Sequence, residues 1–249
     1  MASVLITGAS RGFGLALVRE LSSRPASEIS TVFAAARGDA STLDDLARGS
    51  LGRVMAVRLD VTDQPSIKQA AAEVETRLGG KGLDILINNA GVCQSLEMGD
   101  NLEESFAINV LGVHWVTRAF LPLLQKGTLK KVANISTSFG SITLARAAAF
   151  LPAPSYKISK AAMNALTVQY ALDYEKDGFV FVAIAPGWMK TALGGGDMAD
   201  LTPEEGAKAS LDILFRPNQE INGQFPKVLV KGWENAKGPN VYDGTNIPW

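Results

Sequence analysis

The sequence predicts an α/β protein with a single doubly wound parallel sheet and helices on both faces. Short β-branched and aliphatic runs alternate with longer segments of helical spacing, and this alternation favours parallel strands joined by crossover helices. Several strand runs are apolar nearly throughout, as a sheet buried on both sides requires. No repeat or low-complexity linker divides the sequence, so we expect one domain over residues 1–249.

The individual elements follow from these runs. We predict strands at Ser3–Thr7, Thr31–Ala36, Arg53–Leu59, Asp84–Ile87, Lys131–Ile135, Phe179–Ile184 and Lys227–Val230. We predict helices near Gly12–Ser23, Pro65–Leu78, Leu102–Leu124, Ser155–Lys176 and Pro203–Phe215. Two irregular stretches remain, Thr143–Pro154 and Gly194–Leu201, and loops of this length in a compact domain are usually functional or mobile.

The composition bounds the partners and the compartment. The residues are 47% hydrophobic and 20% charged, and the formal net charge is -1, which gives no electrostatic reason to expect nucleic acid or an anionic membrane as a partner. No apolar run approaches the roughly 18 residues of a membrane span, and Val4–Ile6 is too short for a signal sequence. The single cysteine, Cys93, suits a reducing compartment. We therefore expect a cytoplasmic protein.

A glycine-rich turn follows the first predicted strand and opens the first predicted helix. Its sequence is Thr-Gly-Ala-Ser-Arg-Gly-Phe-Gly, in which Gly8, Gly12 and Gly14 permit close backbone approach. The helix N-terminus that follows offers free N–H groups and a positive dipole end. We expect a Rossmann-type dinucleotide site here, formed by Gly8, Ser10, Arg11, Gly12, Phe13 and Gly14.

Two arginines favour NADP(H) over NAD. The second strand of a dinucleotide fold ends beside the adenosine ribose, where an acidic residue suits NAD and a cation suits NADP. Here the strand is followed by Arg37, and Arg11 lies within the glycine turn. The guanidinium fork matches phosphate oxygens. Asp39, two residues further on, argues in the opposite direction.

Tyr156 and Lys160 are the candidate catalytic pair. Residues four apart share a helical face, so both side chains can enter one cleft. Free tyrosine has a pKa near 10, and lowering it toward 7 takes about 4 kcal/mol. A nearby ammonium group and a positively charged nicotinamide supply stabilisation of this kind. Tyr156 can then donate a proton to a ketone or remove one from an alcohol.

Three motifs together resemble the short-chain dehydrogenase/reductase family. They are the Gly-x-x-x-Gly-x-Gly turn, Asn88-Asn89-Ala90-Gly91 after the fourth strand, and Tyr156-x-x-x-Lys160. The resemblance covers nearly the whole chain. The end of the chain, Tyr242–Trp249, is similar to the sniffer-type, C-factor-like carbonyl reductase branch.

The resemblance implies further cofactor contacts. Besides the residues above, it assigns the cofactor site to Asp60, Val61, Asn88, Asn89, Ala90, Gly91, Tyr156, Lys160, Pro186, Gly187, Met189 and Thr191. It also implies a substrate lid near residues 192–202 and a pocket-forming segment near 224–249. Relatives commonly assemble as dimers or tetramers, so a homodimer or homotetramer is expected.

The resemblance completes the catalytic set with an asparagine and a hydroxyl. Asn109 matches the residue that holds a water connected to the lysine. In register, the family's catalytic serine falls on Thr137, which carries the same hydroxyl with an added methyl. Ser138 is the next candidate, and Ser136 also flanks it.

Other polar and apolar features carry no assigned chemistry. The lone His114 is expected to be core or surface filler, and no second Cys or His clusters with Cys93, so no metal site is expected. The stripe Ala161, Ala165, Val168 and Leu172 has helical spacing and fits either core or a subunit interface.

These features together predict NADPH-dependent reduction of a ketone or aldehyde to an alcohol, or the reverse oxidation. The substrate is a small carbonyl or alcohol compound, and a moderately large apolar ketone is the leading hypothesis. One alternative keeps the cofactor pocket for a non-redox cyclisation or isomerisation in secondary metabolism. Another is a nucleotide-sensing module without turnover.

Overall fold

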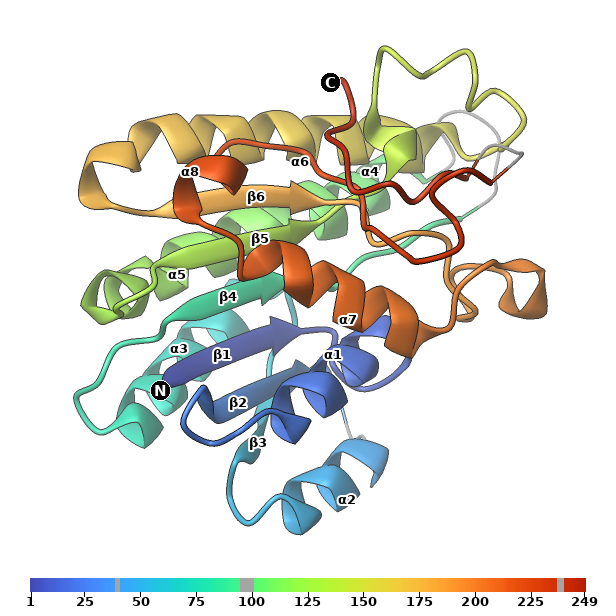
Figure 1. The fold of residues 1–249 in the computed structure, drawn as a ribbon. Helices are drawn as coiled ribbons and strands as arrows, with labels where there is room; N and C mark the ends of the chain where they lie inside the picture. Colours follow the sequence, from blue (N-terminus) through green and yellow to red (C-terminus); the bar gives the residue numbers. More distant parts are fainter. Residues whose placement is uncertain (39–40, 95–100, 237–239) are drawn as a thin grey trace.

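A computed structural model describes residues 1–38, 41–94, 101–236 and 240–249. Within these residues six strands form one parallel sheet in the order β3-β2-β1-β4-β5-β6 (Figure 1). The strands are β1 (Ala2–Thr7), β2 (Ile29–Ala36), β3 (Val54–Arg58), β4 (Ile85–Asn88), β5 (Lys131–Ile135) and β6 (Val180–Ile184). This strand order is that of the doubly wound dinucleotide fold, so the predicted fold class is confirmed.

Helices cover both faces of the sheet (Figure 1). The α-helices are α1 (Gly12–Ser23), α2 (Ser41–Gly49), α3 (Gln64–Leu78), α4 (Leu102–Phe106), α5 (Val113–Lys126), α6 (Pro154–Asp173), α7 (Pro203–Leu214) and α8 (Asn218–Ile221). A π-helix, η1 (Ala107–Gly112), joins α4 to α5, and short 3-10 turns lie at η2 (Ser138–Gly140), η3 (Glu175–Asp177) and η4 (Gly196–Met198).

The sheet separates two hydrophobic cores. Val4 and Ile6 of β1 pack with side chains of α1, α2 and α7. Leu5, between them, packs on the opposite face with side chains of α3, α5 and α6. Successive side chains of a strand point to opposite faces, so a strand buried on both sides must be apolar at every position. This is why the strand runs lack polar alternation.

The predicted seventh strand, Lys227–Val230, is wrong. Lys227 forms an isolated parallel bridge with Ala185, just beyond β6, and Leu229 then pairs antiparallel with Asp243. The segment changes partner within two residues, so no continuous ladder forms. The apolar residues of this segment also differ in burial. Val228 is buried, whereas Leu229 is 51% exposed.

Three helical predictions also need correction. The expected helix Leu102–Leu124 is continuous in outline but contains the π-helical turn of η1, which periodicity did not indicate. Helix α2 was not predicted, and it buries Leu43 alone. The stripe Ala161, Ala165, Val168 and Leu172 is not core, since Leu172 is 63% exposed and Ala165 is exposed too. The subunit-interface alternative stays a prediction.

The composite helix Leu102–Lys126 is long and apolar enough to cross a membrane by length and composition. Of its most apolar window, 56% is buried inside the fold, where Val116 and Phe120 contribute to the core. A core helix passes the same test, so this feature is weak evidence for a membrane span.

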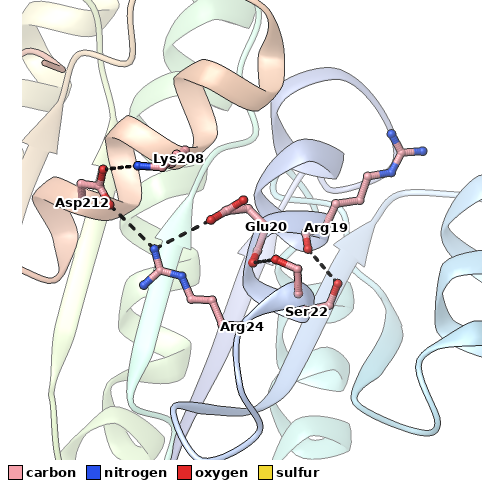
Figure 2. Close-up of polar contacts among 7 residues, drawn as sticks. Arg19, Glu20, Ser22, Arg24, Lys208 and Asp212 are labelled. Atoms are coloured by element: carbon pink, nitrogen blue, oxygen red, sulfur yellow. Dashed lines mark hydrogen bonds and ion pairs between the residues drawn. The ribbon is translucent and has the colours of Figure 1, made fainter. Parts of the chain in front are cut away.

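Polar contacts connect the C-terminal ends of α1 and α7 (Figure 2). Arg24 lies 4.0 Å from the Glu20 carboxylate and 3.9 Å from that of Asp212, which Lys208 also contacts at 3.1 Å. The Arg24 guanidinium also lies 4.7 Å from the centroid of the Phe215 ring. Ion pairs at or near the surface contribute about 1 kcal/mol or less each, so these contacts add little to the stability of the fold.

Candidate active site

The glycine turn has no side chain at Gly8, Gly12 and Gly14, where the backbone is left-handed or closely packed. Gly8 and Gly12 have φ values of +66° and +54°, in the left-handed region that favours glycine. A Cβ on Gly14 would collide with the Gly8 carbonyl and the Asn89 amide. Arg11 occupies the N-cap of α1 and is exposed, whereas the Phe13 ring is buried in the core. Phe13 can therefore serve a ligand only through its backbone.

The predicted adenine end of the cofactor site is a polar cavity. Arg37, Arg58, Asp60 and Ser66 are among its lining residues. Burial would raise the pKa of the Asp60 carboxyl, but hydrogen bonds from Thr62 and the charge of Arg37 hold that pKa below its usual value. Asp39, the residue that argued for NAD, lies outside the described residues.

Two neighbours of Asp60 have mainly structural contacts. Asp63 is the N-cap of α3, but its side chain makes no capping hydrogen bond. Val61 is mostly buried, and its carbonyl would lie 3.0 Å from a Cβ on Gly112. Val61 therefore packs tightly against η1, and glycine is needed at 112 for that approach.

Asn89 holds the glycine turn against the end of β4. Its side-chain amide donates to the carbonyl oxygens of Thr7 and Gly8, at 2.9 and 3.1 Å. The Thr7 hydroxyl in return accepts from the backbone N–H groups of Asn89 and Ala90. Ala90 approaches Gly8 so closely that a Cβ on Gly8 would lie 2.9 Å from the Ala90 Cα. The two motifs predicted to bind one dinucleotide are therefore a single packed unit.

Asn88 belongs to a buried ladder of hydrogen bonds that was not anticipated. Its Nδ2 donates to Thr117 Oγ1 of α5 at 3.1 Å and to Asn134 Oδ1 of β5 at 2.8 Å. Asn134 donates onward to Thr167 Oγ1 of α6 at 2.9 Å. The ladder ties α6, which carries the catalytic pair, to β4 and β5. The predicted cofactor role of Asn88 is therefore indirect.

The structure brings Tyr156 and Lys160 together on the first turns of α6. Pro154 begins the helix, where a residue without an N–H group is tolerated. The Tyr156 and Lys160 side chains are 8% and 5% exposed, and Lys160 Nζ lies 5.9 Å from the Tyr156 ring centroid. Lys160 Nζ also donates to the Ile135 carbonyl at 2.6 Å, which keeps the ammonium group at the end of β5.

Of the three hydroxyls after β5, Thr137 meets the Tyr156 phenol. The Thr137 hydroxyl lies near enough to the Tyr156 phenol to lower its pKa, against the larger opposite effect of burial. Ser136 is buried and donates to Asn164 Oδ1 at 2.6 Å. Ser138 is exposed at the start of η2. The geometry therefore favours Thr137 as the catalytic hydroxyl.

Burial dominates the protonation of the catalytic pair. It raises the pKa of Tyr156 above its ordinary value, and the neighbouring Cys93 adds to that rise. Burial also lowers the pKa of Lys160 to about 8. The expected lowering of the Tyr156 pKa toward 7 is therefore not a property of the protein chain alone. The raised pKa keeps the Tyr156 phenol protonated.

Asn109 lies in η1, with its side chain fully buried. Its Oδ1 accepts from the Val92 N–H, and its Nδ2 donates to the Val92 carbonyl and to Ser159 Oγ, all at 3.0 Å. A Cβ on Gly91 would lie 3.2 Å from Asn109 Oδ1 and 3.7 Å from Lys160 Nζ. Asn109 thus lies near Lys160, and its side-chain amide hydrogen-bonds the backbone of Val92 in the loop after β4.

The loop after β6 closes the other side of the site. The Thr191 methyl would lie 3.4 Å from a Cβ on Gly12, so this loop faces the glycine turn. Gly187 has a φ of +87°. The Met189 side chain packs against Gly206 of α7, so its contribution to a ligand is limited to backbone. The lid that follows contains η4 and carries the exposed side chains of Leu193 and Met198.

Two residues singled out from the sequence have clear places. His114 Nδ1 lies 2.9 Å from the Tyr170 hydroxyl, a contact between α5 and α6. Cys93 is partly buried and interacts electrostatically with both Tyr156 and Lys160, so it lies beside the catalytic pair. Its position two residues after the Asn-Asn-Ala-Gly motif indicates in the sequence that Cys93 lies near the site.

The glycine turn, the Tyr156–Lys160 pair and the parallel sheet define a dinucleotide-dependent oxidoreductase fold. The family model described as short chain dehydrogenase matches residues 2–201, and the chain belongs to this family.

Particular relatives agree with that assignment. Short chain dehydrogenase virK of Hypocrea virens is 32% identical, over 95% of this chain and 93% of that protein. Among solved structures, NADPH-bound carbonyl reductase from chicken fatty liver is 34% identical, with a TM-score of 0.87 over 100% of this chain and 99% of that one. Carbonyl reductase Sniffer of D. melanogaster is 27% identical, with a TM-score of 0.85 over 100% of both chains. The resemblance to this branch is confirmed.

Substituting Thr137 tests which hydroxyl takes part in the reaction. Thr137→Val keeps the shape and removes the hydroxyl, so we expect kcat to fall about 100-fold or more, as when one donor to a reacting oxygen is lost. Thr137→Ser restores the hydroxyl and should recover most of the rate. Ser138→Ala should stay near the parent rate. A large loss in Ser138→Ala with an active Thr137→Val would reverse the assignment.

Replacing Lys160 with methionine should stabilise the fold while abolishing activity. The lowered pKa means that keeping the buried ammonium costs about 3 kcal/mol at neutral pH, and losing its bond to Ile135 offsets about 1 kcal/mol. Between about pH 8 and 10.5 the unfolded chain binds more protons than the folded one, so the stability of the parent rises with pH. Urea unfolding should therefore show a gap between Lys160→Met and the parent that shrinks as pH increases.

Lys157→Met, on the same helix, is the matched control for this effect. Its ammonium donates to the Ala148 carbonyl at 2.6 Å from a partly exposed position. We expect no stabilisation in this variant. A Lys160→Met protein that is less stable than the parent at neutral pH would contradict the argument.

Proposed function

We propose that this protein is an NADPH-dependent carbonyl reductase that converts a ketone or aldehyde into an alcohol. The observation that carries the proposal is the buried Tyr156 phenol, which lies beside Thr137 and one helical turn from Lys160. This arrangement supplies a proton donor, a second hydroxyl for the carbonyl oxygen, and a cation beside both. The similarity to NADPH-bound carbonyl reductase from chicken fatty liver supports the same reaction.

The protonation of Tyr156 favours the reducing direction. A general acid must carry its proton when the substrate binds, and burial raises the pKa of this phenol. As the carbonyl oxygen gains negative charge, Tyr156 transfers its proton to that oxygen and Thr137 donates a hydrogen bond to it. Lys160 stabilises the phenolate that remains. Its lowered pKa also suits an ammonium group that exchanges protons near neutral pH.

The residues present fit a phosphorylated dinucleotide. The glycine turn leads directly into α1, whose N-terminus offers free N–H groups to phosphates, and Arg37 lines a polar cavity at the end of β2. The residues proposed to hold the cofactor are those of the glycine turn, Arg37, Asp60, the Ala90–Gly91 backbone and the loop 186–191. NADPH supplies the hydride when bound.

Exposed apolar side chains support a moderately large apolar ketone as substrate. Leu193 and Met198 lie on the lid, and Ile142 and Phe150 lie on the segment after β5, all four more than half exposed. The non-redox alternative finds no specific support, because the donor, hydroxyl and cation are all in place. A cytoplasmic location and a homo-oligomeric state stay part of the proposal.

Tyr156→Phe tests the proton donor. The variant keeps the ring and removes the hydroxyl, so kcat for ketone reduction should fall by a factor of about 10²–10⁴. NADPH affinity, measured by fluorescence titration, should stay within about threefold, because catalysis and ground-state binding separate in such a variant. Undiminished turnover would remove Tyr156 from the mechanism.

Arg37→Ala tests the choice of dinucleotide. A guanidinium–phosphate bond contributes about 1.5–3 kcal/mol, so the Kd of NADPH should rise about 10–100-fold. NADH lacks the 2′-phosphate and serves as the internal control, with an expected Kd that changes little. Equal weakening of both cofactors would show that Arg37 does not read the phosphate.

A further inference from the structure

Tyr242, near the end of the chain, packs against the loop after β6. Its side chain is 5% exposed. A Cβ on Gly187 would lie 3.3 and 3.5 Å from two carbons of the Tyr242 ring, and 2.6 Å from Leu201 Cδ1. Gly187 is thus enclosed between the C-terminal segment and the end of the lid. Figure 1 shows that segment, in red, at the edge of the sheet where the strands end.

The Tyr242 hydroxyl joins the two ends of the lid. Its oxygen accepts from the Trp188 backbone N–H at 3.1 Å and donates to Asp200 Oδ2 at 2.6 Å. Trp188 precedes the lid and Asp200 lies at its far end. The two ends also pair directly, because Leu201 donates its N–H to the Trp188 carbonyl at 3.0 Å and accepts from the Lys190 N–H at 2.8 Å.

Asp200 receives a second donor from the same C-terminal segment. Asn240 Nδ2 donates to Asp200 Oδ2 at 2.7 Å. A carboxylate that accepts two hydrogen bonds makes charge-assisted contacts, which are stronger than neutral ones. Burial and the Asp200 carboxylate both raise the pKa of the Tyr242 phenol, so it keeps the proton that it donates.

We propose that Tyr242 and Asp200 are positioning residues that fasten the stems of the lid and thereby set the backbone of loop 186–191. Neither residue is placed against the reacting atoms. They act through Trp188 and Gly187, which belong to the loop that the family resemblance assigns to the cofactor site. The part of the inference that concerns the cofactor rests on the proposed function. The claim that Tyr242 and Asp200 fasten the lid is independent of the proposed function.

Hydrogen–deuterium exchange of the cofactor-free protein tests the fastening directly. Tyr242→Phe removes one oxygen and keeps the ring against Gly187. We expect the backbone amides of residues 188–201 to exchange about tenfold faster, because local opening no longer breaks a charge-assisted hydrogen bond. Asp200→Ala should give the same increase, and the double variant should add little, as expected for two members of one interaction.

Tyr170→Phe is the matched control. It removes the same atom from another largely buried tyrosine, whose hydroxyl lies 2.9 Å from His114 Nδ1 on α5. Exchange of residues 188–201 should not change in this variant. If Tyr242→Phe leaves lid exchange at the parent rate, or accelerates exchange equally in β5 and α6, the proposal is overturned.

Kinetics then test the positioning role. Loss of the fastening should raise the Kd of NADPH and the KM of a test ketone several-fold while kcat changes less, since the Tyr156 donor is untouched. A kcat loss as large as that of Tyr156→Phe with unchanged KM would contradict a positioning role. If the parent protein does not bind NADPH, the proposed function fails, while the exchange result still decides whether Tyr242 fastens the lid.

Discussion

The buried amide ladder from α5 through Asn88 and Asn134 to α6 is the interaction on which the site depends. A parallel sheet places the ends of its strands along one edge, but it does not fix how far α6 extends over that edge. The hydrogen bonds Asn88–Asn134 and Asn134–Thr167 fix that distance. Hydrogen bonds are stronger in a low-dielectric interior than in water. Together with the bond from Lys160 to the Ile135 carbonyl, the ladder holds the first turns of α6 at the end of β5.

The glycine turn is also tightly packed against its neighbours. The Asn89 amide occupies the volume that a side chain at position 14 would need, and it binds the carbonyl groups of Thr7 and Gly8. Glycine at position 14 therefore serves the packing of the protein as well as the approach of a phosphate. The glycine turn and the catalytic helix are connected through neighbouring residues, Asn89 and Asn88, at the end of one strand.

Much of the fold and of the site could be predicted from the sequence, because the signals were local. The parallel sheet with helices on both faces follows from the alternation of strand and helix patterns, and Tyr156 and Lys160 share a helical face by spacing alone. What the sequence did not indicate depends on contacts between distant residues. The partner of Asn109 is 17 residues away, that of Asn134 is 33 away, and Asp200 and Tyr242 are 42 apart. The choice of Thr137 over Ser138 likewise required the direction of each side chain. The apolar run Lys227–Val230 misled because strand propensity does not reveal that a segment changes its pairing partner within two residues.

The match to the family model ends at residue 201, one residue beyond the carboxylate that Tyr242 binds. The segment beyond residue 201 nevertheless meets the matched region at several points. Tyr242 and Asn240 both donate to Asp200, and Lys227 pairs with Ala185. The carbonyl groups of Pro248 and Trp249 accept hydrogen bonds from the segment after β5. None of these contacts involves Tyr156 or Lys160. Substitutions in the tail can therefore change the loop after β6 while the buried pair on α6 keeps its place.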